Sequence, residues 1–437
     1  MKKIVTSMAV ALAATSAFAG GLLTTTNQNA HSLRFFSQEA DINLSSLYAN
    51  PAGQAFLKNG WHISGSAMTA VQTRTISATS QLYAMNANNR STTHTFEGKT
   101  FAPVIPSIDF AYVQDKWSVS ARFGVVAGGG TCEFENGIST LETLVAGMAF
   151  KNSLPAYTVD SYLKGKQNYF GLQIGGTYKI IDNLSAYVGV RGVIASCGYE
   201  GYLKTPLLAQ MDPTGEGVVL DCTQSDFGVT PIIGVHYSPI QGLDFAAKYE
   251  FRTRIGLNNE STFSPAAQAL GTISPEAAAF LGQYADGKEV RNDIPAILTL
   301  GGQYRPIENL KVAASWRYYF DKSATKYGNR EKAINDNTME FLASAEWKFC
   351  KWVAVSASWQ KTSFGLSDAY MSDTDFTVSS NSVGGGLRIY PCNLLSIDLG
   401  YMHTFYEERT VNTPAKMMSN VYTRNNNVVG IGLNFAW

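Results

Sequence analysis

The C-terminal segment 429–437 of this 437-residue chain constrains the fold more than any other part of the sequence. Every second residue from Val429 to Trp437 is apolar, and the residues between them are small or polar. Because side chains alternate between the two faces of a strand, the pattern predicts a terminal strand with one apolar face. Such a strand fits a wall with lipid on one side and a watery or plugged lumen on the other, although some soluble proteins also end in an amphipathic strand.

The N-terminus indicates export. Lys2 and Lys3 precede a mostly apolar run at 4–14, and residues 17–19, Ala-Phe-Ala, form a small-residue cleavage site. This pattern predicts a signal peptide of residues 1–19, and its apolar run is too short to cross a bilayer as a helix. An exported chain with an aromatic terminal strand resembles the β-barrels of the Gram-negative outer membrane. We therefore expect a multi-pass barrel in that membrane, inserted by the barrel assembly machinery.

Composition agrees with a barrel. Charged residues make up 16% of the chain and aromatic residues 12%, and the mean hydropathy is −0.07. A value near zero is expected when the lipid face and the lumen face of alternating strands average out. Lys and Arg together number 34, as do Asp and Glu, so no basic excess points to a nucleic-acid partner.

Alternating segments recur along the rest of the chain. We predict about 14 strands, an even number, as bacterial single-chain barrels have. They lie near residues 61–75, 105–114, 117–127, 168–180, 184–196, 226–238, 243–254, 295–305, 310–321, 337–349, 352–361, 380–390, 394–407 and 426–437. Short and long connections alternate along the chain. This alternation matches the two ends of an outer-membrane barrel better than it matches a β-sandwich. The predicted fold class is an all-β, antiparallel transmembrane barrel with both termini on the periplasmic side.

Two of the long connections are predicted to be partly helical. Residues 139–150 carry apolar side chains at helical spacing, and Ser274-Pro275-Glu276 is a helix start with Pro at the first helical position. Two interpretations stay open for these helices. They pack over the barrel mouth, or they offer an apolar surface that collects hydrophobic ligands.

Residues 20–58 do not follow the strand pattern. They are polar and irregular, and they contain Asp41, Ser45 and the run Asn50-Pro51-Ala52-Gly53. A short helix is expected from Ser45, ended by the turn-forming Asn50-Pro51 pair. Such a segment either extends into the periplasm or folds into the lumen.

An N-terminal segment of this kind ahead of fourteen strands resembles the FadL family of outer-membrane channels for long-chain fatty acids and other hydrophobic compounds. The run Asp293-Ile294-Pro295-Ala296 is also similar to a strand entry of that family. The resemblance implies a hatch at 20–58 that plugs a barrel at 59–437. It further implies that Asn50-Pro51-Ala52 lies near a kink in the third strand, where a lateral gap releases an apolar ligand into the bilayer.

The third strand, near 117–127, contains Gly124 and is followed by Gly128-Gly129-Gly130. Glycine inside a strand often marks a bulge or a close backbone approach. We predict that Gly124, on the lumen face, forms the kink and that the three later glycines begin a loop.

A fatty acid needs an apolar tunnel for its tail and one or two cations for its carboxylate. Arg122, Arg191 and Lys248 lie in lumen phase near the predicted kink and are the candidate head-group contacts, with Leu44 and Leu47 of the hatch along the tail. The alternative is that these cations pair with lumen acids and hold barrel and hatch together.

Nothing in the sequence indicates an enzyme. The histidines lack the H-E-x-x-H spacing, no G-x-S-x-G elbow occurs, and no C-x-x-C pair suggests a metal site. We expect no catalytic residue, metal or cofactor. Of the five cysteines, Cys197 and Cys222 are predicted to form a disulfide at the outer end of the fifth and sixth strands, Cys350 and Cys392 could pair between neighbouring turns, and Cys132 would be the odd one.

The predicted function is uptake of long-chain fatty acids or other hydrophobic small molecules, with lateral release beside the hatch. The alternatives are a general diffusion porin and a surface adhesion or structural barrel with an inert lumen. We expect a monomer whose partners are a hydrophobic ligand and outer-membrane lipid. The sequence does not identify the substrate.

Overall fold

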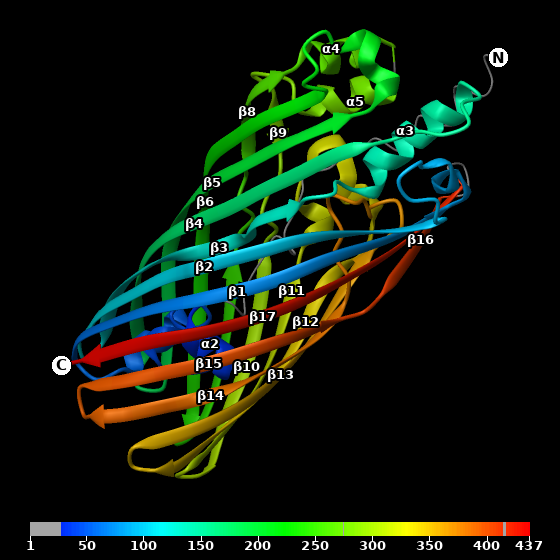
Figure 1. Ribbon diagram of the computed structural model, residues 1–437. Helices are drawn as coiled ribbons and strands as arrows, with labels where there is room; N and C mark the ends of the chain where they lie inside the picture. Colours follow the sequence, from blue (N-terminus) through cyan, green and yellow to red (C-terminus); the bar gives the residue numbers. More distant parts are fainter. Residues whose placement is uncertain (1–27, 274, 414–416) are drawn as a thin grey trace.

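The computed structural model describes residues 28–273, 275–413 and 417–437, and its strands form one closed antiparallel sheet (Figure 1). Seventeen strands take part, and β8, β9 and β16 continue the lines of β7, β10 and β15, so the wall is a barrel of fourteen strands. All fourteen predicted strands are confirmed. Their bounds are β1 (Gly60–Ser80), β2 (Thr93–Val113), β3 (Trp117–Phe134), β4 (Asp160–Ile181), β5 (Leu184–Lys204), β6 (Val218–Ile240), β7 (Leu243–Glu250), β8 (Gly256–Phe263), β9 (Glu289–Arg291), β10 (Ile297–Ile307), β11 (Leu310–Tyr319), β12 (Ile334–Cys350), β13 (Val353–Leu366), β14 (Ser380–Cys392), β15 (Leu395–Tyr406), β16 (Arg409–Thr413) and β17 (Met418–Ala436).

Closure of the barrel depends on the terminal strand. β17 pairs with β1 along its whole length, and the amide of Trp61 donates to the carbonyl of Trp437 at 2.8 Å. The predicted alternation holds, because Val429, Ile431 and Leu433 are exposed on the outer face. No edge strand is left between the first and last strands of the wall.

Several strands are longer than predicted at one end. β2 begins at Thr93 rather than near residue 105, and its outward side chains there include Glu97 and Lys99, which are exposed. Polar outward residues indicate that this part of the strand stands above the lipid band. Hydrophobic alternation cannot reveal such an extension, because its outward residues are polar and its inward residues mix Phe96 with His94 and Thr100.

The two ends of the barrel differ (Figure 1). Short turns join strands at the turn end, where the C-terminus lies, and long connections with α3 (Ser139–Lys151), α4 (Pro265–Ile273) and α5 (Pro275–Gln283) cover the loop end. Both predicted helices are present, although the expected cap Ser274 lies outside the described residues. α4 was not predicted. Val145, Ala146 and Ala149 of α3 are buried in a cluster with Tyr83 and Phe376, as expected for a helix packed over the mouth.

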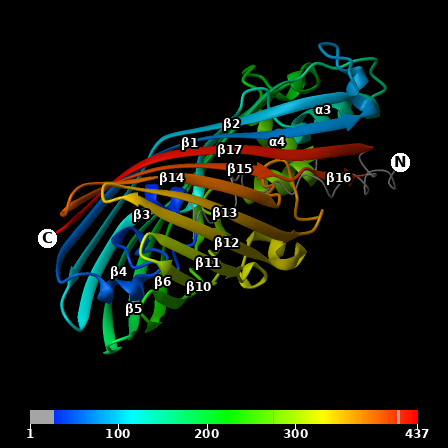
Figure 2. The same ribbon diagram turned by 90° about the horizontal axis from the view of Figure 1, so that it is seen from below.

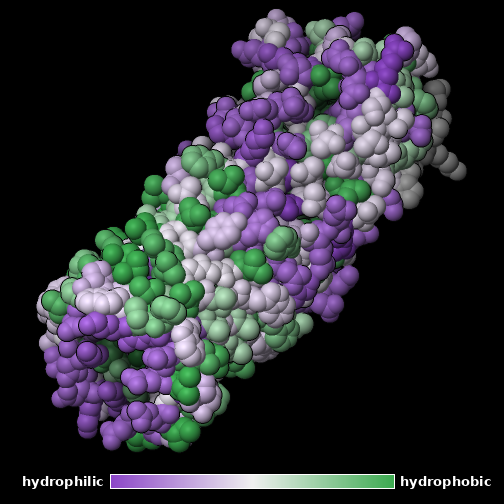
Figure 3. Space-filling view, turned by 60° about the horizontal axis from the view of Figure 1, so that its bottom comes forward, coloured by the Kyte–Doolittle hydropathy of each residue, from purple (hydrophilic) through white to green (hydrophobic). Residues whose placement is uncertain are grey.

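The outer surface carries an apolar band. Figure 3 shows hydrophobic residues over the wall near the turn end and hydrophilic residues over the loop end. Among the described residues, no helix is both long enough and apolar enough to cross a membrane.

The described part of the predicted hatch, residues 28–58, lies inside the lumen at the turn end (Figure 2). It forms α2 (Ala30–Arg34), the 3₁₀ helix η1 (Leu44–Ser46) and the 3₁₀ helix η2 (Pro51–Phe56). The expected short helix near Ser45 is present as η1. The Asn50-Pro51 pair does not end it but begins η2, because the Asn50 side chain accepts from the Gly53 amide and caps that helix.

Glycines on the lumen face make room for the hatch. A Cβ atom at Gly400 of β15 would lie 2.5 Å from the Ala30 carbonyl oxygen and 2.8 Å from the Leu33 Cβ atom. A Cβ atom at Gly430 of β17 would lie 3.1 Å from Leu33 Cδ1. α2 therefore approaches the barrel backbone more closely than any larger residue at these positions would allow.

Candidate functional site

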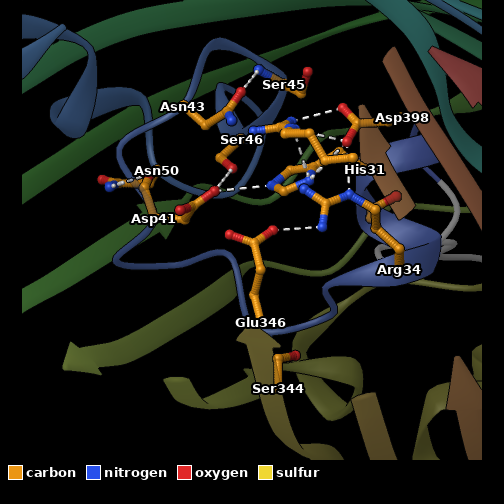
Figure 4. A network of polar contacts seen from close by, with 12 residues as sticks. His31, Arg34, Asp41, Asn43, Ser45, Ser46, Asn50, Ser344, Glu346 and Asp398 are labelled. Atoms are coloured by element: carbon orange, nitrogen blue, oxygen red, sulfur yellow. Dashed lines mark hydrogen bonds and ion pairs between the residues drawn. The ribbon is translucent and has the colours of Figure 1, made fainter. Parts of the chain in front are cut away.

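An ion network fixes the hatch to the barrel wall (Figure 4). Arg34 of α2 donates from Nε to Asp398 of β15 at 2.6 Å and from Nη1 to Glu346 of β12 at 2.5 Å. Asp41 of the hatch accepts from His31 at 2.8 Å and from Lys311 of β11 at 3.0 Å. Buried charges are tolerated when each is paired and hydrogen-bonded, and removing one partner is costly.

His31 is uncharged in this network. Burial, together with the positive charges of Arg388 and Arg34, lowers the pKa of His31 to about 4. At neutral pH its Nε2–H donates to Asp41, and its Nδ1 accepts from Arg388 at 3.4 Å. Burial opposes ionisation of Asp41, but the charge of Lys311 and the bond from His31 hold the pKa of that carboxyl well below its usual range.

The ring of Tyr48 in the hatch contacts all three cations that were predicted from the sequence as head-group contacts. Its ring lies 4.5 Å from Lys248 Nζ, 4.6 Å from Arg191 Cζ and 5.5 Å from Arg122 Cζ. Each contact is a cation–π interaction with a desolvated aromatic ring.

Each of these cations also pairs with an acid of the wall. Arg191 and Lys248 bind Glu250 at 2.6 and 2.5 Å, and Arg122 binds Asp109. Lys248 further donates to the Tyr48 carbonyl oxygen at 2.6 Å. The contacts are those expected of cations that hold barrel and hatch together. Their predicted contact with a ligand stays a prediction.

The wall is interrupted between β2 and β3. Thr100 pairs with Cys132 and Ser107 pairs with Gly124, but residues 101–106 and 125–131 between these pairs do not face each other in register. β3 keeps its pairing with β4, with register shifts at 125–127 and 128–130. This part of β3 therefore bends away from β2 and stays attached to the other neighbour, as bulges allow.

Glycines produce the interruption, but not the glycine that was predicted. Gly128 and Gly130 have φ values of 89° and 77°, a region that glycine adopts without strain. The prediction that residues 128–130 begin a loop is wrong, because β3 continues to Phe134. Gly124 lies in regular pairing with both neighbouring strands and only borders the interruption.

A cavity of about 210 Å³ extends from the lumen to this interruption. On the wall side it is lined by Val104, Pro106, Val125 and Phe170. Across the lumen it reaches β12 to β15 and β17, where Arg424 lines it. Phe101 and Val104 are 64% and 63% exposed, so the wall side of the cavity adjoins the lipid-facing surface.

The hatch residues of the predicted gate lie elsewhere. The Pro51 and Ala52 carbonyl oxygens accept from Thr177 of β4 and Ser185 of β5, at 3.0 and 2.7 Å, and Asn50 contacts His236 of β6 at 2.9 Å. Gly53 lies within η2, and its amide donates to Asn50 Oδ1 at 3.0 Å.

Tyr48 is the hatch residue that packs against the bulged part of β3, in a buried cluster with Val126 and Ala127. Leu44 and Leu47 are buried, and Leu44 packs against Ala111 and Val113. Neither leucine lines the cavity.

The predicted disulfide is not formed. Cys197 and Cys222 are free, and they stand opposite Gln224 and Tyr199, so each is offset from the other by two residues along the paired strands. The two strands continue beyond both cysteines, which therefore do not flank the loop as expected. Cys132, Cys350 and Cys392 are also free thiols.

Sequence reasoning missed two features of the site. Tyr48 lies in an irregular segment that has no periodicity to reveal its partners. Arg424 lies inside β17, and counting back every second residue from Gly430 would have placed it on the lumen face.

No protein-family model matches the sequence, and no curated protein matches it at the sequence level. Solved structures match in fold. A FadL homologue of Pseudomonas aeruginosa is similar with a TM-score of 0.69 and 16% identity, over 95% of this chain and 100% of that one. The toluene transporter TodX of P. putida matches at 0.58 and 15%, over 90% and 95% of the two chains. The toluene transporter TbuX of Ralstonia pickettii matches at 0.55 and 15%, over 93% and 98%. The predicted FadL-type fold, a hatch-plugged barrel of fourteen strands, is therefore confirmed for this chain.

Proposed function

We propose that this protein is an outer-membrane channel that takes up hydrophobic small molecules, such as long-chain fatty acids or aromatic hydrocarbons. The observation that carries this proposal is the cavity that leads from the lumen to the interrupted wall between β2 and β3. Concave sites lined mainly by apolar groups with a few polar ones are typical of small-molecule binding. The fold shared with a FadL homologue and two toluene transporters supports the same function.

Lateral release is part of the proposal. A ligand in the cavity lies beside Val104 and Phe170, on the wall side, so it has an apolar path into the bilayer. The path toward the turn end leads through the hatch, which is tied to the wall by buried ion pairs. A hydrophobic solute loses free energy when it leaves water for lipid, and the sideways route keeps it out of water.

The remaining expectations fit the same picture. The turn end and both termini face the periplasm, and the loop end faces the medium. The protein acts as a monomer in contact with outer-membrane lipid and catalyses no reaction. A general porin would need an open lumen, and the packed hatch argues against one.

Narrowing the wall side of the cavity tests the proposal. Ala102 lines the cavity beside the interruption, and Ala102→Trp should fill it. We expect cells that depend on this protein to take up labelled hexadecanoate and toluene several times more slowly with that variant. The control is Val190→Trp on the lipid-facing side of β5, where Val190 is exposed. Full uptake of both compounds by a correctly folded Ala102→Trp variant would rule out this route.

A further inference from the structure

Two buried arginines face each other across neighbouring strands, on the loop-end side of the hatch. Arg74 of β1 is paired in register with Arg424 of β17, and the two are 2% and 6% exposed. Buried guanidinium groups are normally neutralised by a carboxylate, because burying an unpaired charge is costly. Within the described part of the chain, neither arginine forms an ion pair.

Other buried arginines of the lumen differ from this pair. Each of them binds at least one carboxylate, and they are Arg34, Arg122, Arg191, Arg317 and Arg388. Glu340 also lines the cavity, but it is bound by Arg317 at 3.3 Å and by Tyr319 at 2.6 Å. Asp375, next to Phe376, acts on Arg74 only from beyond ion-pair distance and is itself bound by Arg330 at 2.7 Å. Among the described acids, none therefore forms an ion pair with Arg74 or Arg424.

The contacts of Arg74 and Arg424 are with aromatic rings and one carbonyl oxygen. Arg74 Nη2 donates to the Phe376 carbonyl oxygen at 2.7 Å, and its Cζ lies 4.2 Å from the Phe376 ring centre. Arg424 Cζ lies 4.7 Å from the Tyr406 ring centre. The Nε atoms of both arginines are buried without an acceptor. A cation–π contact offsets part of the desolvation cost of a guanidinium group. It satisfies none of the N–H donors, which lie in the plane of the guanidinium group.

Arg424 is placed to receive a ligand. It lines the same cavity that opens at the interrupted wall, together with Gln72 and Asn426. Along β1, Arg74 lies four positions from Ala70, which is about 13 Å of strand. Ala70 lines the cavity and pairs with Ala102 at the edge of the interruption. The cavity therefore has a cationic end at Arg424, whose partner in register is Arg74, and an apolar end at the wall.

We propose that Arg74 and Arg424 bind the acid group of an amphiphilic carboxylate, whose apolar tail extends through the cavity toward the interruption between β2 and β3. This inference rests on the proposed function, since it assigns a ligand class to the same cavity. An alkanoate and an alkyl-substituted aromatic acid share the required chemistry. A neutral hydrocarbon or alcohol leaves the charge of the pair unbalanced, so the site selects for anions.

Equilibrium binding to the full-length protein in phosphatidylcholine nanodiscs, corrected for empty nanodiscs, tests the inference at pH 8.5. The probes are labelled dodecanoate, 1-dodecanol and 4-butylbenzoate. We expect dodecanoate to bind more tightly than 1-dodecanol, and Arg424→Gln and Arg74→Gln each to weaken carboxylate binding about tenfold, as loss of a charged hydrogen bond does. Arg424→Lys should keep part of the preference. Arg409→Gln, which changes a partly exposed arginine of β16, should bind like the unaltered protein.

The outcomes separate this inference from the proposed function. Undiminished 1-dodecanol binding by the glutamine variants shows that they are folded. If the unaltered protein binds 1-dodecanol and both acids equally well, or if the glutamine variants keep full carboxylate affinity, the anion site is refuted and the channel proposal stands. If no probe binds above the nanodisc background, both fail. A third outcome is that the unaltered protein binds 4-butylbenzoate but not dodecanoate, and that the glutamine variants lose the binding of 4-butylbenzoate. This result supports the anion site, with an aromatic acid as its ligand.

Discussion

At the scale of single residues, Tyr48 is the side chain that joins the hatch to the charged part of the wall. Three cations surround its ring, and its hydroxyl is buried without a hydrogen-bond partner. We predict that Tyr48→Ala destabilises hatch docking by about 3–5 kcal/mol, as removal of a large buried aromatic does. Hydrogen exchange of residues 28–58 measures this. Tyr48→Phe keeps the ring and should be nearly neutral, and equal effects of the two variants would contradict the assignment.

The pH dependence of the hatch should reflect His31. An unfolded histidine has a pKa of about 6.5, and the folded pKa is lowered to about 4, so the docked state binds fewer protons between these values. Docking should therefore weaken as pH falls from about 6.5 toward 4, by up to about 3 kcal/mol. Loss of the Asp41 contribution begins only below that window, because the folded pKa of Asp41 is depressed. Hydrogen exchange from pH 7 to 4.5 should show this slope, and His31→Gln should flatten it. If the pH dependence of hatch docking is unchanged in His31→Gln, another titratable group causes it.

The same residues show what sequence can predict about a site. The alternation placed Arg122, Arg191 and Lys248 on the lumen face, and all three are buried there. It could not identify their partners, because Tyr48 reaches them from a segment without periodicity, up to 200 residues away along the chain. A side chain's direction is local information, whereas its contacts depend on how distant segments dock.

At the scale of elements, the lumen face of the strands is shaped for α2. We predict that Gly400→Ala displaces this helix and costs about 1–3 kcal/mol, as overpacking of a filled interior does, because the added Cβ would meet Ala30 and Leu33. Hydrogen exchange at residues 30–34 reports the displacement. Gly65→Ala on β1 is the matched control, since a Cβ atom there meets nothing within 4 Å. Equal protection of α2 in both variants would refute the packing argument.

Strand number was predictable and strand shape was not. Fourteen apolar alternations mark the lipid band, but β2 and β6 continue beyond it toward the loop end, where their outward residues are polar. The position of the interruption between β2 and β3 could not be predicted from the sequence either. Both Gly124 and the three glycines at 128–130 satisfy the same compositional signal. Only the loss of pairing with β2 and the positive φ values of Gly128 and Gly130 decide between them.

At the scale of the whole molecule, the hatch should control whether the lumen conducts ions. Residues 28–57 fill the lumen at the turn end and are tied to β11, β12 and β15 by buried ion pairs. Deleting 28–57 should raise single-channel conductance in planar bilayers well above that of the intact protein. A Gly65→Ala protein, with an intact hatch, should stay at the low level. An equally low conductance after the deletion would mean that the hatch does not close the lumen.

The central claim is that hydrophobic ligands pass from the lumen through the interrupted wall between β2 and β3. Photolabelling with a diazirine-bearing fatty acid in intact outer membranes, followed by peptide mass spectrometry, tests it most directly. The account predicts that labels concentrate at residues 101–106 and 125–131 and that Ala102→Trp removes them. Labels spread evenly over the outer face of the barrel, or unchanged by Ala102→Trp, would contradict it.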